Sequence, residues 1–198
     1  YSPDATSAGR RALKNLALSY ISISDDVQYQ ALAGQQFRGA DNMTDRMAAL
    51  VALNDRDGEE RDAALADFYD KYKDDAIVID KWLSLQATSS RPDTLDQVKK
   101  LMDHRIFSIK QPNKVRALIS SFCSGNPYRF HAQDGSGYQF LADRILQIDP
   151  VNPQIAARLA TQLGRWRGYE NNLASLMQKE LKRILATDNL SPDLFEIA

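Results

Sequence analysis

Several features that would assign a chemistry at once are missing from this sequence. Its 198 residues include one cysteine, Cys123, which excludes an internal disulfide framework and a zinc site built on cysteines. No apolar run approaches the roughly 18 to 20 residues that cross a bilayer, and the N-terminus lacks the basic and then apolar pattern of a signal peptide. We therefore predict a protein of a reducing, cytoplasmic compartment that does not contact a membrane.

An excess of charge of one sign is missing as well. The chain has 25 Lys and Arg residues against 26 Asp and Glu residues, mixed along its length, and a formal net charge of -1. Without a basic tract we expect no binding to nucleic acid. The first residue is Tyr1 rather than methionine, which indicates that the chain has been cut from a longer polypeptide or processed.

What the sequence has instead is helical periodicity. Nearly every longer segment repeats its apolar positions at intervals of three and four residues, and the alternation typical of strands is absent. The segments expected to be helical are residues 8–21, 41–54, 58–75, 75–88, 91–104, 111–122, 137–149, 151–163, 168–186 and 191–197. Because they are short and joined by short loops, we predict one all-α domain over residues 1–198, a superhelical, solenoid-like array of antiparallel helix pairs. A helix bundle is the alternative, and no strict sequence period supports a consensus repeat.

The periodicity also predicts which side chains pack against neighbouring helices. The apolar face of residues 8–21 consists of Leu13, Leu16, Ala17 and Tyr20. The apolar side chains of residues 75–88 include Ile77, Trp82 and Leu85. We expect each of these faces to need a neighbour, and both Trp82 and Trp166 to be packing residues.

The most polar and glycine-rich segment, RFHAQDGSGYQF, invites a catalytic interpretation with Ser136 as nucleophile, His131 as base and Asp134 as its orienting group. A nucleophile elbow needs glycines at G-x-S-x-G on a strand-to-helix turn, and DGSGY has neither that spacing nor a strand. We favour a loop whose glycines permit positive φ and in which Asp134 or Ser136 caps the next helix. An anion-binding nest of backbone N–H groups is an intermediate possibility.

Metal ligands are not spaced for a site within this chain. His104 and His131 are the only histidines, and neither belongs to H-E-x-x-H or lies near a second ligand in the sequence. We interpret both as surface or capping residues. Asp74, Asp75 and Asp80 lack the twelve-residue pattern of a calcium loop, and we interpret them as acids at a helix N-terminus.

A polar pair marks the helix expected at residues 151–163. Asn152 can serve as its N-cap and Pro153 as its first helical residue. Gln154 and Arg158 then lie four residues apart on one stripe, beside the apolar stripe that the helix buries. The ordinary interpretation of such a pair is two solvated side chains.

Several segments together resemble one family. They are NLALSYI, NMTDRMAAL, FYDKYKDDAIVIDKWLSLQA, VRALISSF, FHAQDGSGYQFLADRI, NPQIAARL and LSPDLFEI. In this order they resemble the C-terminal domain of the bacterial aminopeptidase N (alanyl aminopeptidase) family of zinc metallopeptidases, over essentially the whole chain. The chain departs from the family at Gln111, where the family usually has asparagine before the proline, and at the serines of ALISSF, where other members carry glycine.

The resemblance implies a non-catalytic domain. In the family, the zinc ligands of H-E-x-x-H and a downstream glutamate belong to a thermolysin-like domain that is not part of this chain, and the C-terminal domain closes over it and lines the cavity for peptide substrates. The resemblance also places Gln154 near the pocket for the N-terminal side chain, Arg158 toward the residues beyond the scissile bond, and Arg116 in a similar position. Arginine suits this role because its planar guanidinium binds a carboxylate through two hydrogen bonds and keeps its charge.

Two other functions stay open from the residues alone. A stand-alone helical scaffold would bind another protein along its concave face, without a catalytic domain. A hydrolase that used the HAQDGSG segment would be active as the isolated chain. The aminopeptidase resemblance instead predicts that the main partner of this chain is its own catalytic domain, with zinc held there.

Overall fold

The computed structural model describes residues 1–24 and 27–198, and the side chains of all of these except residues 27–30. Every regular element among the described residues is a helix, which confirms the predicted all-α class. The chain divides into two compact units, residues 1–85 and residues 86–198. No helix among the described residues is both long and apolar enough to span a membrane.

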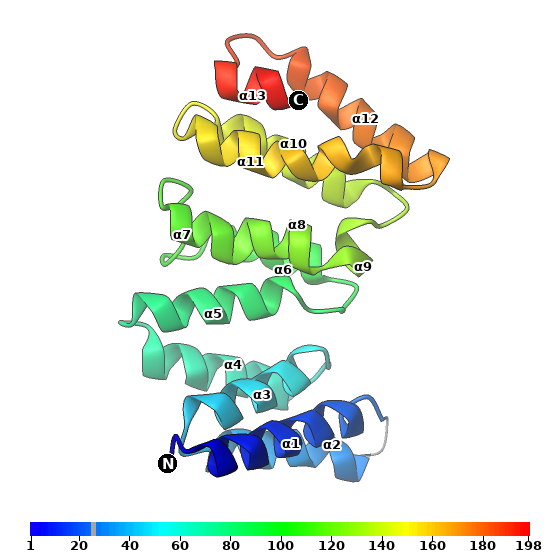
Figure 1. Ribbon diagram of the computed structural model, residues 1–198. Coiled ribbons are helices and arrows are strands. Elements are labelled where there is room, and N and C mark those ends of the chain that lie inside the picture. The colour runs from blue at the N-terminus through cyan, green and yellow to red at the C-terminus, as the bar shows by residue number, and fades with distance from the viewer. Residues whose placement is uncertain (25–26) are drawn as a thin grey trace. The chain divides into compact units, whose positions relative to one another are not determined.

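The first unit consists of successive helices, and its first four pack against one another, with the third helix in contact with the first, second and fourth (Figure 1). Its helices are α1 (Ala5–Ile21), α2 (Val27–Gly39), α3 (Met43–Asn54), α4 (Glu59–Tyr72) and most of α5 (Ala76–Ala87). Short polar side chains set the helix starts: the Asn42 side chain accepts the N–H of Asp45 at 2.9 Å, and Asp75 accepts the N–H groups of Ile77 and Val78. This capping confirms Asp75 as an acid at a helix N-terminus.

Two expectations for this unit were wrong. The periodicity did not predict α2, whose sequence VQYQALAGQQFRG has no clean apolar stripe. Leu13, Leu16 and Tyr20 of α1 were expected to pack inward, but they are 70%, 54% and 70% exposed, and Ile77 is 75% exposed. A helical period identifies the apolar face of a helix, but it does not say whether the neighbour of that face lies within the same unit.

Trp82 confirms its predicted packing role. Its ring is buried, lies 5.2 Å from the ring of Tyr69, and its Nε1–H donates to the carbonyl of Leu65 at 2.9 Å. Trp166 is only partly buried, and the guanidinium of Arg167 lies 4.2 Å from its ring. The prediction for Trp166 was therefore correct only in part.

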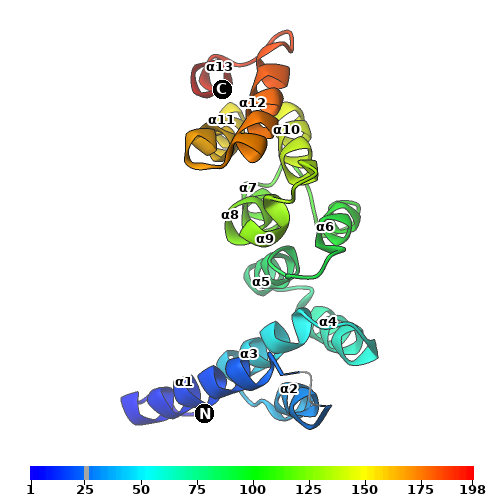
Figure 2. The same ribbon diagram turned by 90° about the vertical axis from the view of Figure 1, so that its right-hand side faces the viewer.

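The second unit begins with short helices and ends with long ones. They are α6 (Thr94–Met102), α7 (Pro112–Val115), a π-helical turn (Arg116–Ser120), α8 (Ser121–Gly125), α9 (Pro127–Phe130), α10 (Ser136–Ile148), α11 (Pro153–Gly164), a 3-10 turn (Arg165–Gly168), α12 (Asn171–Leu185) and α13 (Pro192–Ile197). Figure 2 looks nearly along α6 and α8 and shows α10, α11 and α12 packed beside one another. These helices place the candidate residues described below.

Aromatic side chains fill the core of the second unit. The rings of Phe130 and Phe140 lie edge-on to Phe122 at 6.2 and 5.6 Å, and Tyr138 lies 5.2 Å from Phe130. All four side chains are at most 4% exposed. Gly137 is needed beside them, because a Cβ there would lie 2.3 Å from the carbonyl oxygen of Phe130.

Candidate functional site

Helix α11 holds the polar pair as the sequence predicts. The Asn152 side chain accepts the N–H of Ile155 at 3.1 Å, and Pro153 is the first helical residue. Leu159 and Leu163 are buried, as are three alanines, Ala156, Ala157 and Ala160. The start and the inner face of α11 therefore fix the direction in which its outer side chains project.

Gln154 and Arg158 both lie on the exposed side of α11. Neither side chain has a hydrogen-bond or ion-pair partner among the described residues of the chain. An exposed guanidinium with no carboxylate beside it offers all of its donors to a ligand. The pair can thus bind a polar or anionic group without first breaking an interaction within the chain.

Arg116 begins the π-helical turn between α7 and α8. Its side chain is exposed, and its Nη1–H donates to Oδ1 of Asn113 at 3.2 Å. The N–H of Ser121 bonds to the carbonyl of Arg116, the i to i+5 bond that defines a π turn. Single π turns within helices occur often at functional sites. Sequence periodicity could not reveal this turn, because it depends on backbone hydrogen bonds rather than on side-chain spacing.

The side chains of Gln154, Arg158 and Arg116 do not all contact one another in the structure. Gln154 and Arg158 share a face of α11, whereas Arg116 lies on a different segment of the same unit. The departure at Gln111 has a visible consequence, since Gln111 precedes α7 but its side chain accepts no capping hydrogen bond.

The glycine-rich segment forms a loop, as expected, but the details were only partly correct: Gly137 lies inside α10 without a positive φ, and the N-cap of α10 is Gly135, with no side-chain capping hydrogen bond. Gly135 has φ of 74°, in the left-handed region, and Asp134 Oδ1 accepts the N–H of Ser136 at 2.9 Å. That hydrogen bond lowers the pKa of Asp134. His131 does not join Ser136, because both of its ring nitrogens are bonded elsewhere. The Ser–His–Asp arrangement, which we had considered but not favoured, is therefore not assembled.

His131 instead lies between two tyrosines. Its Nδ1 is 2.7 Å from the hydroxyl of Tyr138, and its Nε2 is 3.0 Å from the hydroxyl of Tyr169. Burial lowers the pKa of His131, and burial together with the charges of Tyr169 and Glu170 raises the pKa of Tyr138 to about 12. His131 is also the C-cap residue of α9, where its backbone N–H donates to the carbonyls of Arg129 and Pro127, so the predicted capping role is confirmed.

His104 does act locally at the end of α6. Its Nδ1 accepts the N–H of Ile106 at 3.3 Å, which agrees with a capping role. Burial, with a smaller effect of Arg105, lowers the pKa of His104. Within the part of the chain that the structure describes, no three residues of the types His, Cys, Asp and Glu are grouped so that they could hold a metal ion.

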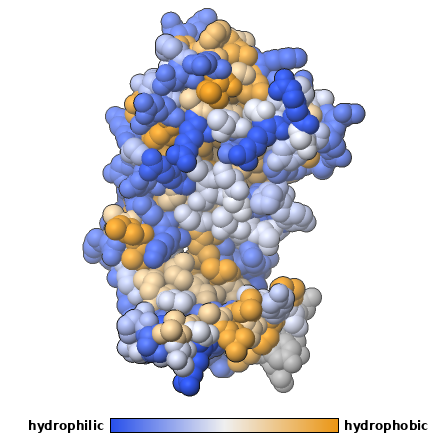
Figure 3. Space-filling model, in the orientation of Figure 1, coloured by the Kyte–Doolittle hydropathy of each residue, from blue (hydrophilic) through white to orange (hydrophobic). Residues whose placement is uncertain are grey.

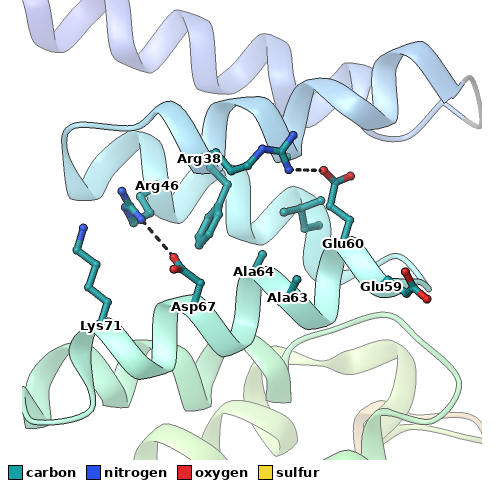
Figure 4. A pocket seen from close by; sticks show the side chains of 11 residues that line it. Arg38, Arg46, Glu59, Glu60, Ala63, Ala64, Asp67 and Lys71 are labelled. Carbon is teal, nitrogen blue, oxygen red and sulfur yellow. Dashed lines mark hydrogen bonds and ion pairs between the residues drawn. The ribbon is translucent and has the colours of Figure 1, made fainter.

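A pocket of about 740 Å³ opens among α2, α3 and α4 (Figure 4). Arg38 pairs with Glu60 at 2.8 Å, and Arg46 pairs with Asp67 at 3.6 Å across it. Lys71 also lines the pocket, as do Phe37, Leu53, Ala63 and Ala64. Cations and carboxylates balance one another here, so the pocket does not select a ligand of one charge. Residue patterns did not predict this pocket, because its lining residues are spread over three helices.

The fold and the exposed polar face of α11 define an all-α protein of the helical-repeat class. The chain belongs to the family described as "Domain of unknown function (DUF3458_C) ARM repeats", whose pattern matches residues 1–198. Armadillo-type repeats stack helix groups in sequence order, which confirms the predicted solenoid-like array.

The chain is also similar to parts of known aminopeptidases. It is 41% identical over 198 residues to Aminopeptidase N of Caulobacter vibrioides and 38% identical over 187 residues to Aminopeptidase N of Escherichia coli, covering 100% and 94% of this chain. A crystal structure of Legionella pneumophila aminopeptidase A in complex with aspartic acid matches 98% of this chain with a TM-score of 0.92 and 38% identity. These likenesses confirm the resemblance that the sequence segments indicated.

The matched chains are much longer than this one. The chain spans 23% of the Caulobacter protein, 22% of the Escherichia coli protein and 23% of the Legionella chain. It corresponds to the C-terminal part of its relatives.

Proposed function

We propose that this chain is the non-catalytic C-terminal domain of a zinc aminopeptidase that removes N-terminal residues from peptides, and that it covers the active site and lines the substrate cavity. The observation that carries the proposal is the 41% identity to an aminopeptidase over the whole chain, combined with a coverage of only 23% of that relative. The peptide chemistry would then lie mainly in the other three-quarters of the polypeptide.

We assign the zinc site to the part of the polypeptide outside these 198 residues. The described residues of this chain do not fit a zinc site, because they hold no suitable cluster of ligands and because hydrogen bonds already engage Nδ1 of His104 and both ring nitrogens of His131. A zinc ion supplies Lewis-acid polarisation of a carbonyl and an activated water when bound. The residues of this chain would instead bind and orient the peptide.

Arg158 is the residue to which we assign the main contact with substrate. Its guanidinium is exposed, has no partner among the described residues, and projects from a helix that is capped at its start and buried along its inner face. A short peptide ends in a carboxylate, which a guanidinium binds through two parallel hydrogen bonds. Gln154, one turn earlier, would contact the peptide backbone or side chain, and Arg116 would add a second cation.

The test uses the full-length polypeptide with Arg158→Ala. Loss of a charge-assisted hydrogen bond in a wet cavity should lower kcat/KM for di- and tripeptides by about three- to thirtyfold. An aminoacyl nitroanilide has no such carboxylate, so its kcat/KM should change by less than about twofold. Arg158→Lys should recover only part of the loss, because an ammonium cannot form the paired contact.

A matched control is Lys182→Ala. This change removes an exposed cation of the same unit, on α12, and should leave both substrates unaffected. Equal losses on peptide and anilide for Arg158→Ala would show that Arg158 supports the fold or a domain interface, and its assignment to substrate would then be wrong. Activity of the 198-residue chain alone would contradict the non-catalytic role.

A further inference from the structure

The exposed side of α11 continues past Gln154 and Arg158. At about 100° per residue, Thr161 and Arg165 fall within about 60° of Arg158 on the same side of the helix, and both are exposed. Arg165 directly follows the last residue of α11 and has a φ of -78°, so the direction of its side chain still follows the helix. We call Gln154, Arg158, Thr161 and Arg165 the α11 polar face. Figure 3, in the orientation of Figure 1, shows strongly hydrophilic surface where α11 lies.

The guanidinium of Arg165 is as available to a ligand as that of Arg158. Neither side chain has a hydrogen-bond or ion-pair partner among the residues that the structure describes. Residues 150–169 contain no Asp or Glu, so no carboxylate of this segment competes with an incoming anion. The guanidinium of Arg167, by contrast, lies over the ring of Trp166, 4.2 Å from its centre. Two uncommitted arginines therefore extend from one side of α11.

The spacing of these two arginines corresponds to a whole number of peptide residues. Arg165 follows Arg158 by seven residues, and a rise of about 1.5 Å per residue places them about 10.5 Å apart along the axis of α11. An extended peptide advances by about 3.3 Å per residue, so this distance equals about three peptide residues. A peptide that ends at Arg158 would end at Arg165 if it were three residues longer.

Thr161 lies between the two arginines and can support such a peptide. Its hydroxyl donates to the carbonyl of Arg158 at 2.7 Å, which fixes its orientation. The lone pairs of the same oxygen can accept an N–H group from the main chain of a peptide. The α11 polar face thus offers a cation, an acceptor and a second cation in a row.

We propose that Arg165 binds the C-terminal carboxylate of peptides about three residues longer than those whose carboxylate Arg158 binds. The inference rests on the proposed function, because it extends the contacts assigned there to Gln154 and Arg158. Since Gln154 is assigned to an earlier part of the peptide than Arg158, a longer peptide continues toward Arg165. The substrate class would then include penta- and hexapeptides, whose carboxylates lie beyond Arg158 and would otherwise lose a charge-assisted contact.

The experiment measures kcat and KM of the full-length polypeptide on peptides of two to six residues that share their first residue, each as free acid and as C-terminal amide. Arg165→Ala should lower kcat/KM for the penta- and hexapeptide acids by about three- to tenfold, and for the di- and tripeptides by less than about twofold. The loss should appear in KM, because a contact far from the scissile bond is equally strong in the ground state and the transition state. Arg158→Ala should affect the short peptides more than the long ones.

The amides and a neighbouring arginine are the controls. The hexapeptide amide lacks the carboxylate, so Arg165→Ala should change its kcat/KM by less than about twofold. Arg167→Ala removes the same charge two residues later, but from a side chain that points about 200° away around the helix and lies over Trp166. It should change the hexapeptide acid by less than about twofold. Arg165→Lys should recover only part of the loss, because an ammonium cannot form the paired contact.

Three results would overturn the proposal. Equal losses for Arg165→Ala on the hexapeptide acid and its amide would mean that Arg165 stabilises the C-terminal end of α11, where a cation interacts favourably with the helix dipole. Equal losses for Arg165→Ala and Arg167→Ala would mean a general effect of charge. No loss at any peptide length would mean that substrates do not reach Arg165.

These outcomes separate this inference from the proposed function. If Arg158→Ala impairs di- and tripeptides selectively while Arg165→Ala has no effect at any length, only the inference about Arg165 is wrong. A full-length polypeptide that releases no N-terminal residue from any of these peptides would refute both.

Discussion

The two units of this chain are both helical, but the contacts that hold α1 in the first unit differ in kind from those in the aromatic core of the second. In residues 1–85, polar contacts connect elements: Asp45 of α3 accepts hydrogen bonds from Lys14 and Asn15 of α1, at 2.5 and 2.9 Å. Burial alone would raise the pKa of Asp45, but hydrogen bonds from Lys14, Asn42 and Asn15 outweigh it and lower the pKa. In residues 86–198, the Phe122, Phe130 and Phe140 rings pack edge to face.

This contrast shows which kind of contact each unit uses at these helices. The aromatic core excludes water from the interior of the second unit. Directional polar contacts can position α1 without burying its apolar stripe, which stays exposed in the first unit. We therefore expect the second unit to depend mainly on packing and the first on a few polar contacts.

The largest effect should come from breaking the aromatic core. Phe122→Ala removes a fully buried ring with two edge-to-face partners, and should lower the free energy of unfolding of the 198-residue chain by about 4 to 5 kcal/mol. Phe68→Ala in the first unit removes an equally buried ring whose partner is Tyr72 at 4.7 Å, and should cost about 3 kcal/mol. Denaturant titration followed by circular dichroism measures both.

The order of these two values is the informative result. If Phe68→Ala costs as much as Phe122→Ala, the first unit depends on packing as strongly as the second and the contrast is wrong. Tyr128→Ala serves as the control, because Tyr128 is 70% exposed and its loss should cost under about 0.5 kcal/mol.

Residue periodicity predicted most of this fold, because an amphipathic helix carries its period in the sequence. Helix α11 is the best case: its cap, its first proline and its exposed pair were all predicted. The stripe of α1 was also identified correctly as an apolar face, yet it was assigned a neighbour that the described chain does not supply. Periodicity did not predict α2, because its apolar residues do not form a stripe.

The candidate residues were predictable to a smaller extent. That Gln154 and Arg158 share one face follows from their spacing, and the structure confirms that both are exposed. Their role and that of Arg116 came from the family resemblance and stay predictions. The π turn at Arg116 and the two tyrosine contacts of His131 could not be predicted, because both depend on which distant or backbone groups meet in three dimensions.

A polar contact of the first unit should give a smaller effect. Asp45→Ala removes a buried carboxylate that accepts from Lys14, Asn15 and Asn42, and should lower the free energy of unfolding by about 2 kcal/mol. We expect no larger loss of unfolding free energy, because the Lys14 side chain is 50% exposed and water screens its ion pair with Asp45.

Asp70→Ala is the matched control for this change. Asp70 pairs with Lys73 at 3.5 Å on the surface of α4, and its loss should cost under about 0.5 kcal/mol. Hydrogen exchange adds a local readout, since Asp45→Ala should loosen α1 more than any other helix. An effect of Asp45→Ala no larger than that of Asp70→Ala would mean that polar contacts do not position α1.

The smallest effect should appear as a pH dependence between pH 7.5 and 5.5, which we assign to the second unit because both histidines of the chain lie there. Burial lowers the pKa of His131 below its ordinary value of 6.5. Tyr138 is fully buried, and its pKa of about 12 keeps its hydroxyl neutral, so it offers no negative charge to an imidazolium. The folded chain thus favours the neutral ring.

The sign follows from the lowered pKa. The unfolded chain takes up the proton first as pH falls, so the stabilisation is complete above about pH 6.5 and is lost as pH falls toward the folded pKa. Between pH 7.5 and 5.5 the free energy of unfolding should fall by under about 1 kcal/mol because of His131. His104, whose pKa burial also lowers, should cause a similar decrease.

Denaturant titrations at several pH values, for the chain with and without His131→Gln, isolate the contribution of His131. The variant should be less stable at pH 7.5 and should show a shallower pH dependence. A free energy of unfolding that rises as pH falls would mean that the imidazolium is stabilised between Tyr138 and Tyr169, and that the second unit also relies on a charged polar contact.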